Sequence, residues 1–307
     1  MGGLLMNRRY FIKQAGIGAT VAGFGTFPLQ LFAADDFVTI TILHTNDLHG
    51  HIEPFTGGDE TLVNKGGLAR ISELVKITRE QNPNTLLLDA GDMFQGTPYF
   101  NYFRGDLILK LMSATGYDAG TIGNHEFDNG LRGILEALPN AKFPIINSNY
   151  DFSDTILAGK FQRWKVIKRD SIKVGIYGLG IELKGLVSDK NYGNTIYNDP
   201  VKVALEMESF LKNEKKCDLV ICLSHLGLRY DDNAVSDVVF APETKYTDLI
   251  VGGHTHTYLA EPMFLKNKIG EQVIVNQAWW GGLAVGKIDF VFERGENRKK
   301  EVYTTHL

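Results

Sequence analysis

A chain of 307 residues, with 44% hydrophobic and 22% charged residues, has the composition of a globular protein and room for one large domain or two small ones. These values exclude a disordered chain and a protein with several membrane spans. The formal net charge is −4, and the first 34 residues contain Arg8, Arg9 and Lys13 but no acidic residue. The rest of the chain is therefore acidic, which argues against binding to a nucleic acid polymer.

The first 34 residues resemble a twin-arginine export signal. The pair Arg8-Arg9 precedes an apolar run at 15–29, which is rich in small residues and shorter than the roughly 20 residues of a spanning helix. An amphipathic leader helix is the alternative. The candidate cleavage sites after Ala33 and Ala34 lack a small residue at the −3 position, so cleavage stays open. We expect an exported protein in the periplasm or cell envelope, anchored there if the leader is not cleaved.

Beyond the leader, short runs of Val, Ile and Leu alternate with longer segments of helical period. We predict strands over residues 38–44, 85–88, 119–122, 144–147, 164–168, 173–177, 219–223, 248–251, 272–276 and 285–292. We predict helices over residues 68–81, 105–114, 131–137 and 200–213, the last with Pro200 in its first turn. No repeat or Pro/Gly/Ser-rich linker divides this region, so we expect one α/β domain over 35–307.

Polar residues follow several of the predicted strands directly. In α/β folds, ligands bind in the crevice beyond the carboxyl ends of the strands, so clusters that are scattered in the sequence can converge there. Five of the eight histidines fall in these clusters, a concentration that argues against separate structural roles. The clustered residues are Asp47, His49, Asp92, Asn124, His125, His225, His254 and His256.

The residue types in these clusters suit a divalent metal centre. Asp47 and His49 are two residues apart, so in an extended turn both can face one ion. The carboxylate of Asp92 has two oxygens that can bridge two cations, and Asn124 offers a neutral amide oxygen. A mixed shell of oxygen and nitrogen suits Zn, Mn, Co or Fe, and the order of affinities does not choose among them.

Together these clusters resemble the motif blocks of the calcineurin-like metallophosphoesterase superfamily, and within it the 5'-nucleotidase family. The blocks are Asp47-x-His49, Gly91-Asp92, Gly123-Asn124-His125-Glu126, His225 and Gly252-Gly253-His254-Thr255-His256, and the features of the narrower family are residues 44–50, 66–70, 95–97 and 123–128. The resemblance spans roughly residues 38–293. It implies a four-layer α/β/β/α metallophosphoesterase sandwich with a dinuclear centre.

The resemblance also implies a distribution of ligands and a reaction. One metal would be held by Asp47, His49 and His256, the other by Asn124, His225 and His254, with Asp92 bridging the two. Two divalent ions can activate a shared water for direct attack on a phosphate ester. We expect hydrolysis of phosphate monoesters, with 5'-nucleotides as substrates.

His125 is not a metal ligand in this scheme. It can donate to the phosphoryl oxygens or protonate the leaving oxygen. Asp128, three residues on, can orient and charge that imidazole, and the resemblance implies the same pair. The alternative role for Asp128 is the N-terminal cap of the following helix.

Substrate contacts are less well defined by the sequence. Phe94, Trp279 and Trp280 flank the predicted centre and can form an aromatic wall for a base, although ordinary packing is the alternative. Arg70 begins the first predicted helix and can reach a phosphate, or it forms a surface ion pair.

Many 5'-nucleotidases carry a second, carboxyl-terminal domain that selects the substrate. This sequence ends at Leu307, so we expect that domain to be absent and either supplied by a separate partner chain or not used. The alternative functions are accordingly a 2',3'-cyclic phosphodiesterase, a broad phosphatase, or a catalytic subunit that depends on a substrate-binding partner. Sulfate-ester and thiosulfate hydrolases share a related fold but carry additional motifs that we do not find.

Overall fold

Strands that are buried on both faces account for the continuous apolar runs. A computed structural model describes residues 37–57, 59–232, 234–295 and 300–306, so the predicted leader lies outside the described residues. In β2 (Thr85–Asp89), Leu86 and Leu88 face the space between two sheets, whereas Leu87 faces a layer of helices. Successive side chains of a strand point to opposite faces, so such a strand needs an apolar residue at every position.

The strands form two mixed sheets, with parallel pairs at one side of the first sheet and in the centre of the second. The first has the order β13 (Lys300–His306), β12 (Gly286–Glu293), β1 (Phe37–Thr45), β2, β3 (Ala119–Gly120). The second has the order β10 (Met263–Lys266), β11 (Gln272–Asn276), β9 (Leu249–Gly252), β8 (Leu219–His225), β6 (Ile172–Gly180), β5 (Trp164–Arg169). Parallel pairing joins β1, β2 and β3 in one sheet and β6, β8, β9 and β11 in the other. A separate small sheet pairs β4 (Tyr150–Asp151) with β7 (Ile196–Tyr197).

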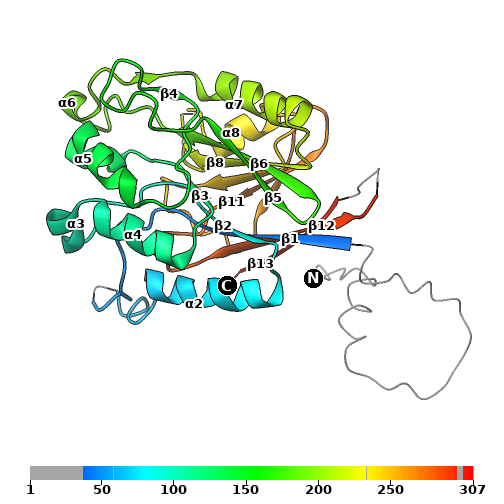
Figure 1. Cartoon of the computed structure of the whole chain (residues 1–307), viewed down its shortest axis with the longest axis horizontal. Helices are drawn as coiled ribbons and strands as arrows, with labels where there is room; N and C mark the ends of the chain where they lie inside the picture. Colours follow the sequence, from blue (N-terminus) through cyan, green and yellow to red (C-terminus); the bar gives the residue numbers. More distant parts are fainter. Residues whose placement is uncertain (1–36, 58, 233, 296–299, 307) are drawn as a thin grey trace, which may run out of the picture. The chain divides into compact units, whose positions relative to one another are not determined.

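Helices cover the outer face of each large sheet, which completes four layers (Figure 1). On the first sheet lie α2 (Leu68–Gln81), α4 (Asp106–Thr115) and α5 (Gly130–Ala137), and on the second lie α7 (Pro200–Ser209) and α8 (Asp237–Phe240). The short helices α3 (Pro98–Phe103) and α6 (Asp189–Tyr192) lie in connections. At the start of α7 the carboxylate of Asp199 accepts hydrogen bonds from the backbone of Val201 and Lys202. The expected α/β/β/α fold is confirmed.

Several predicted elements differ from those observed. Residues 144–147 form isolated bridges with Gly120 and Gln162 instead of a strand, because the backbone pairs with a different segment at each step. The helix predicted over 200–213 ends at Ser209 and continues as a π-helical turn, Phe210–Glu214. The strands β10 and β13 were not predicted, because edge strands are short or polar and carry little apolar signal.

The topology brings distant segments to one edge of the sandwich. The carboxyl ends of β1, β2 and β3 and those of β8 and β9 each lead into a loop that carries predicted site residues. Within the described residues, no helix is both long and apolar enough to span a bilayer.

Candidate metal centre

Five of the seven predicted metal ligands have a backbone in the left-handed region. Their φ angles are 50° at Asp47, 47° at His49, 55° at Asp92, 74° at His254 and 48° at His256. Side chains other than glycine rarely adopt this conformation, and such residues cluster at functional sites because the surrounding structure enforces it. Hydrogen bonds between loops do so here: the backbone of Asp47 donates to Gly91 O at 2.9 Å, and that of His49 to Asp92 O at 2.9 Å.

The first ligand group consists of Asp47, His49 and His256. The ligand atoms lie within 4.8 Å of one another, and Nε2 of His256 is 2.9 Å from Nε2 of His49 and 3.4 Å from Oδ1 of Asp47. Nδ1 of His49 lies 2.5 Å from the carbonyl oxygen of Gln95, to which it donates. The lone pair of His49 Nε2 is therefore directed at the other ligands, as in metal-binding histidines.

The second group consists of Asp92, His225 and His254, with Asn124 beside them. Nδ1 of His225 donates to Ala90 O at 2.7 Å, which leaves Nε2 as a lone pair 2.9 Å from Oδ2 of Asp92. Two electron pairs facing each other repel unless a proton or a metal ion lies between them. Nδ1 of His254 is 2.8 Å from Oδ1 of Asn124, so the amide oxygen reaches the same point.

The two groups adjoin each other, because Nε2 of His225 is only 3.9 Å from Oδ1 of Asp47. Burial alone would lower the pKa of His225, but the Asp92 carboxylate raises it to about 10, so without metal a proton compensates this carboxylate. Burial lowers the pKa of His254 to about 4 and leaves that imidazole neutral, the form that binds metal. A largely buried set of carboxylate, amide and imidazole donors thus fits two divalent cations.

His125 lies next to the two groups but belongs to neither. Its ring centroid is 5.2 Å from that of His49, and its side chain is 37% exposed. Nδ1 of His125 is hydrogen-bonded to Oδ2 of Asp128 at 2.8 Å, which raises the pKa of His125 to about 9. Asp128 is not the cap of α5, because Asn129 occupies that position. The pair is therefore a protonated imidazole held by a carboxylate at the rim of the centre.

The residues predicted to contact the substrate lie in different parts of the structure. Trp280 stacks on His256, and Trp279 packs against Tyr258, with 5.4 Å between the ring centroids. Phe94 is 4% exposed and lies in the core beneath α4 and α5, so its ring does not face the centre's open side. Arg70 is exposed in the first turn of α2 and has no ion pair with another described residue.

Sequence reasoning assigned no role to Asn46 and Gln277. Nδ2 of Asn46 donates to Oδ2 of Asp47 at 2.6 Å and to the carbonyl of Trp279 at 2.5 Å. Oε1 of Gln277 accepts from the backbone of Thr257 at 2.8 Å, and its Nε2 donates to Gly253 O at 2.7 Å. Both support the ligand loops. The sequence signal that could have found them is their position, because Asn46 directly follows β1 and Gln277 directly follows β11.

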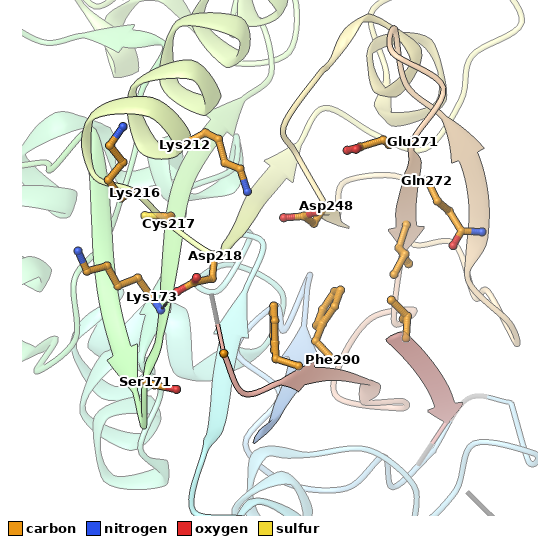
Figure 2. Close-up of a pocket in the computed structure, with 14 residues that line it drawn as sticks. Ser171, Lys173, Lys212, Lys216, Cys217, Asp218, Asp248, Glu271, Gln272 and Phe290 are labelled. Carbon is orange, nitrogen blue, oxygen red and sulfur yellow. Dashed lines mark hydrogen bonds between the residues drawn. The ribbon is translucent and has the colours of Figure 1, made fainter. Parts of the chain in front are cut away.

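A separate cavity of about 820 Å³ lies at the opposite ends of the strands (Figure 2). Lys173 is the second residue of β6, while Asp218 and Asp248 directly precede β8 and β9. These are the amino ends of parallel strands, whereas the predicted ligands follow the carboxyl ends. None of the predicted site residues lines this cavity.

Comparisons with known proteins identify relatives over most of the chain. The family described as calcineurin-like phosphoesterase matches residues 40–258. The chain is 34% identical to the snake venom 5'-nucleotidase of Gloydius brevicauda over 87% of this chain and 47% of that protein. It is 33% identical to the 5'-nucleotidase of Homo sapiens over 83% and 47%. A crystal structure of a 5'-nucleotidase precursor from Thermus thermophilus matches with a TM-score of 0.75 at 33% identity, over 88% of this chain and 55% of that one. The chain spans about half the length of these relatives.

Proposed function

The chain belongs to the calcineurin-like phosphoesterase family, and from this premise we propose that it is an exported, dinuclear-metal phosphoesterase that hydrolyses phosphate monoesters, with 5'-nucleotides as substrates. The observation that carries the proposal is the convergence of two ligand groups, with Nε2 of His225 in one group 3.9 Å from Oδ1 of Asp47 in the other and the hydrogen-bonded pair of His125 and Asp128 beside them. The resemblance of residues 1–34 to an export signal, and the venom protein among the relatives, support export.

The ligand groups would hold two divalent cations, and Zn, Mn, Co and Fe all suit the donors. One ion would bind to Asp47, His49 and His256, the other to Asn124, His225 and His254, with Asp92 between them. When bound, such a pair lowers the pKa of a shared water for direct attack and neutralises charge on the phosphoryl oxygens.

His125 would supply the proton that the leaving oxygen needs. Its Nδ1 is engaged by Asp128, so Nε2 is the atom that remains to donate. The carboxylate keeps the imidazole charged and fixes the plane of its ring, which is the role expected of a positioned general acid.

Trp279 and Trp280 would form one wall of the site for the leaving group. The stacking of Trp280 on a candidate ligand, His256, supports this role. Arg70 would contact a substrate phosphate. The closeness of Arg70 to this wall is supported by the hydrogen bond from the backbone of Gly67 to Gly281 O. This bond joins the start of α2 to the turn that follows Trp279 and Trp280.

A substrate panel tests the proposal. Protein reconstituted with Mn²⁺ would be given 5'-nucleotides, 2',3'-cyclic nucleotides, sugar phosphates and an aryl phosphate. Released phosphate and nucleoside would be measured, together with the nucleoside monophosphate that opening of a cyclic nucleotide produces. We expect the highest kcat/KM with 5'-nucleotides. Preference for cyclic nucleotides would make the protein a phosphodiesterase, and a flat profile would make it a broad phosphatase. No hydrolysis despite two bound metals would mean that the chain depends on a substrate-binding partner.

A further inference from the structure

We propose that Glu126 is a positioning residue that locks the loop of Asp92 onto the loop of Asn124, so that both ligands are in place before metal binds. The proposal rests on the two-metal function proposed for the site. Glu126 is 1% exposed and lies in the 3-10 helix His125–Asn129, directly after the predicted ligand Asn124 and the predicted acid His125.

The carboxylate of Glu126 accepts hydrogen bonds from four backbone N–H groups on two loops. From the loop after β2, the N–H of Asp92 donates to Oε2 at 3.1 Å, while Met93 and Phe94 donate to Oε1 at 2.7 and 3.3 Å. From the loop after β3, the N–H of Gly123 donates to Oε2 at 2.6 Å. One side chain therefore joins the backbones on which two of the predicted ligands lie.

The contact between the loops is reciprocal. Oδ1 of Asp92 accepts the backbone N–H of His125 at 2.8 Å, so each loop supplies a carboxylate that binds the backbone of the other. Asp92 adopts its left-handed φ of 55° inside this pair of contacts. A Cβ at Gly123 would collide with Asp92 Oδ1 and His225 Nε2, which shows how closely the loops approach. The pair of carboxylates holds a strained ligand in one orientation.

The number and kind of donors explain why a carboxylate occupies this position. Four N–H groups need an acceptor on both oxygens, and an ionised carboxylate is an acceptor only. A glutamine of the same shape would turn its own NH2 group toward N–H donors and lose half of these hydrogen bonds. Glu126→Gln therefore alters the contacts of this side chain with little change in volume.

Glu208 on α7 offers a matched control. It is also 1% exposed, and its carboxylate accepts the backbone N–H groups of Lys245, Tyr246 and Thr247 and the hydroxyl of Thr247, at 2.8 to 3.0 Å. These residues precede β9, at the end of the strand opposite to His254. Glu208→Gln thus replaces an equally buried carboxylate that accepts the same number of hydrogen bonds but contacts no ligand loop.

The test is titration of metal-free full-length protein with Mn²⁺ by calorimetry, with the EPR spectrum of the bound Mn²⁺ as a second readout. We expect Glu126→Gln to bind Mn²⁺ about 10- to 100-fold more weakly and to lose the signal of a coupled ion pair. Glu208→Gln should keep the affinity of the wild type, even if its melting temperature falls.

Wild-type affinity in Glu126→Gln, or an equal loss in Glu208→Gln, would overturn the proposal. If Glu126→Gln does not fold, the same comparison between Glu126→Asp and Glu208→Asp decides, because both shorten the side chain and keep the charge. None of these metal-binding measurements depends on hydrolysis of a substrate. A wild-type protein that binds two Mn²⁺ ions but hydrolyses nothing would count against the proposed function and not against this role of Glu126.

Discussion

Trp280 lies parallel to His256, with 5.7 Å between the ring centroids and 11° between the ring planes. The same indole meets the rings of His51 and Phe55 edge to face, at 5.3 and 5.2 Å. A large aromatic surface is thereby attached to a candidate metal ligand. Such a surface would bind the planar base of a nucleotide's leaving group by stacking and would offer nothing to a small aliphatic phosphate.

Replacing Trp280 should therefore change substrate preference. For Trp280→Ala we expect KM for a 5'-nucleotide to rise about tenfold, the value that corresponds to a lost aromatic stack, with little change in KM for a small aliphatic phosphate. Steady-state kinetics on both substrates would measure this. Phe264→Ala, which removes a 48% exposed ring from the edge strand β10, is the control. An equal rise in KM for both substrates would exclude Trp280 as the wall for the leaving group.

Removal of the His125 side chain should separate chemistry from metal binding. We expect His125→Ala to lower kcat by about two orders of magnitude or more, because no proton is then supplied to the leaving oxygen. Metal content, measured by inductively coupled plasma mass spectrometry, should stay at the wild-type value. If metal is lost in parallel with activity, His125 is a ligand or a structural residue instead.

The pH dependence should report the pairing of His125 with Asp128. Hydrogen bonding to Asp128 raises the pKa of His125 to about 9, so a proton donor at this position is present at lower pH and is lost as pH rises through that pKa. In Asp128→Asn the pKa should fall toward its ordinary value, and the alkaline limb of kcat should move to lower pH.

Bound cations lower the pKa of an imidazolium in both proteins, so the displacement between the two pH profiles is the quantity to compare. Identical alkaline limbs in the wild type and Asp128→Asn would show that this carboxylate does not control the proton of His125.

Asp92 should be required for the second ion. Asp92 Oδ2 lies 2.9 Å from His225 Nε2, and an amide in its place cannot offer two charged oxygens to two cations. We expect Asp92→Asn to retain at most one equivalent of metal. Its melting temperature should also rise less than that of the wild type on addition of Mn²⁺, because a ligand that binds more weakly stabilises the folded state less at the same concentration. Two equivalents of tightly bound metal in this variant would contradict the bridging role.

The local pattern of the sequence determined most of the elements. The helix predicted over residues 68–81 has the bounds of α2, and the run at 219–223 marked the buried strand β8, because a period of 3.6 or a continuous apolar run reports directly on burial. The same reasoning identified the polar residues that follow the strands. The short edge strand β10 escaped it because its four residues alternate between half-buried and exposed positions.

What the tertiary structure decided is how these residues meet. The backbone of His254 donates to the carboxylate of Asp47 across 207 positions of sequence, a contact that depends on the order of strands in two sheets. Packing between loops likewise determines the left-handed backbone of the ligands, the hydrogen bonds of Glu126 to two loops and the burial of Phe94. Residue type and spacing carry the chemistry of each side chain, whereas the distances and orientations among side chains arise only when the sheets pack together.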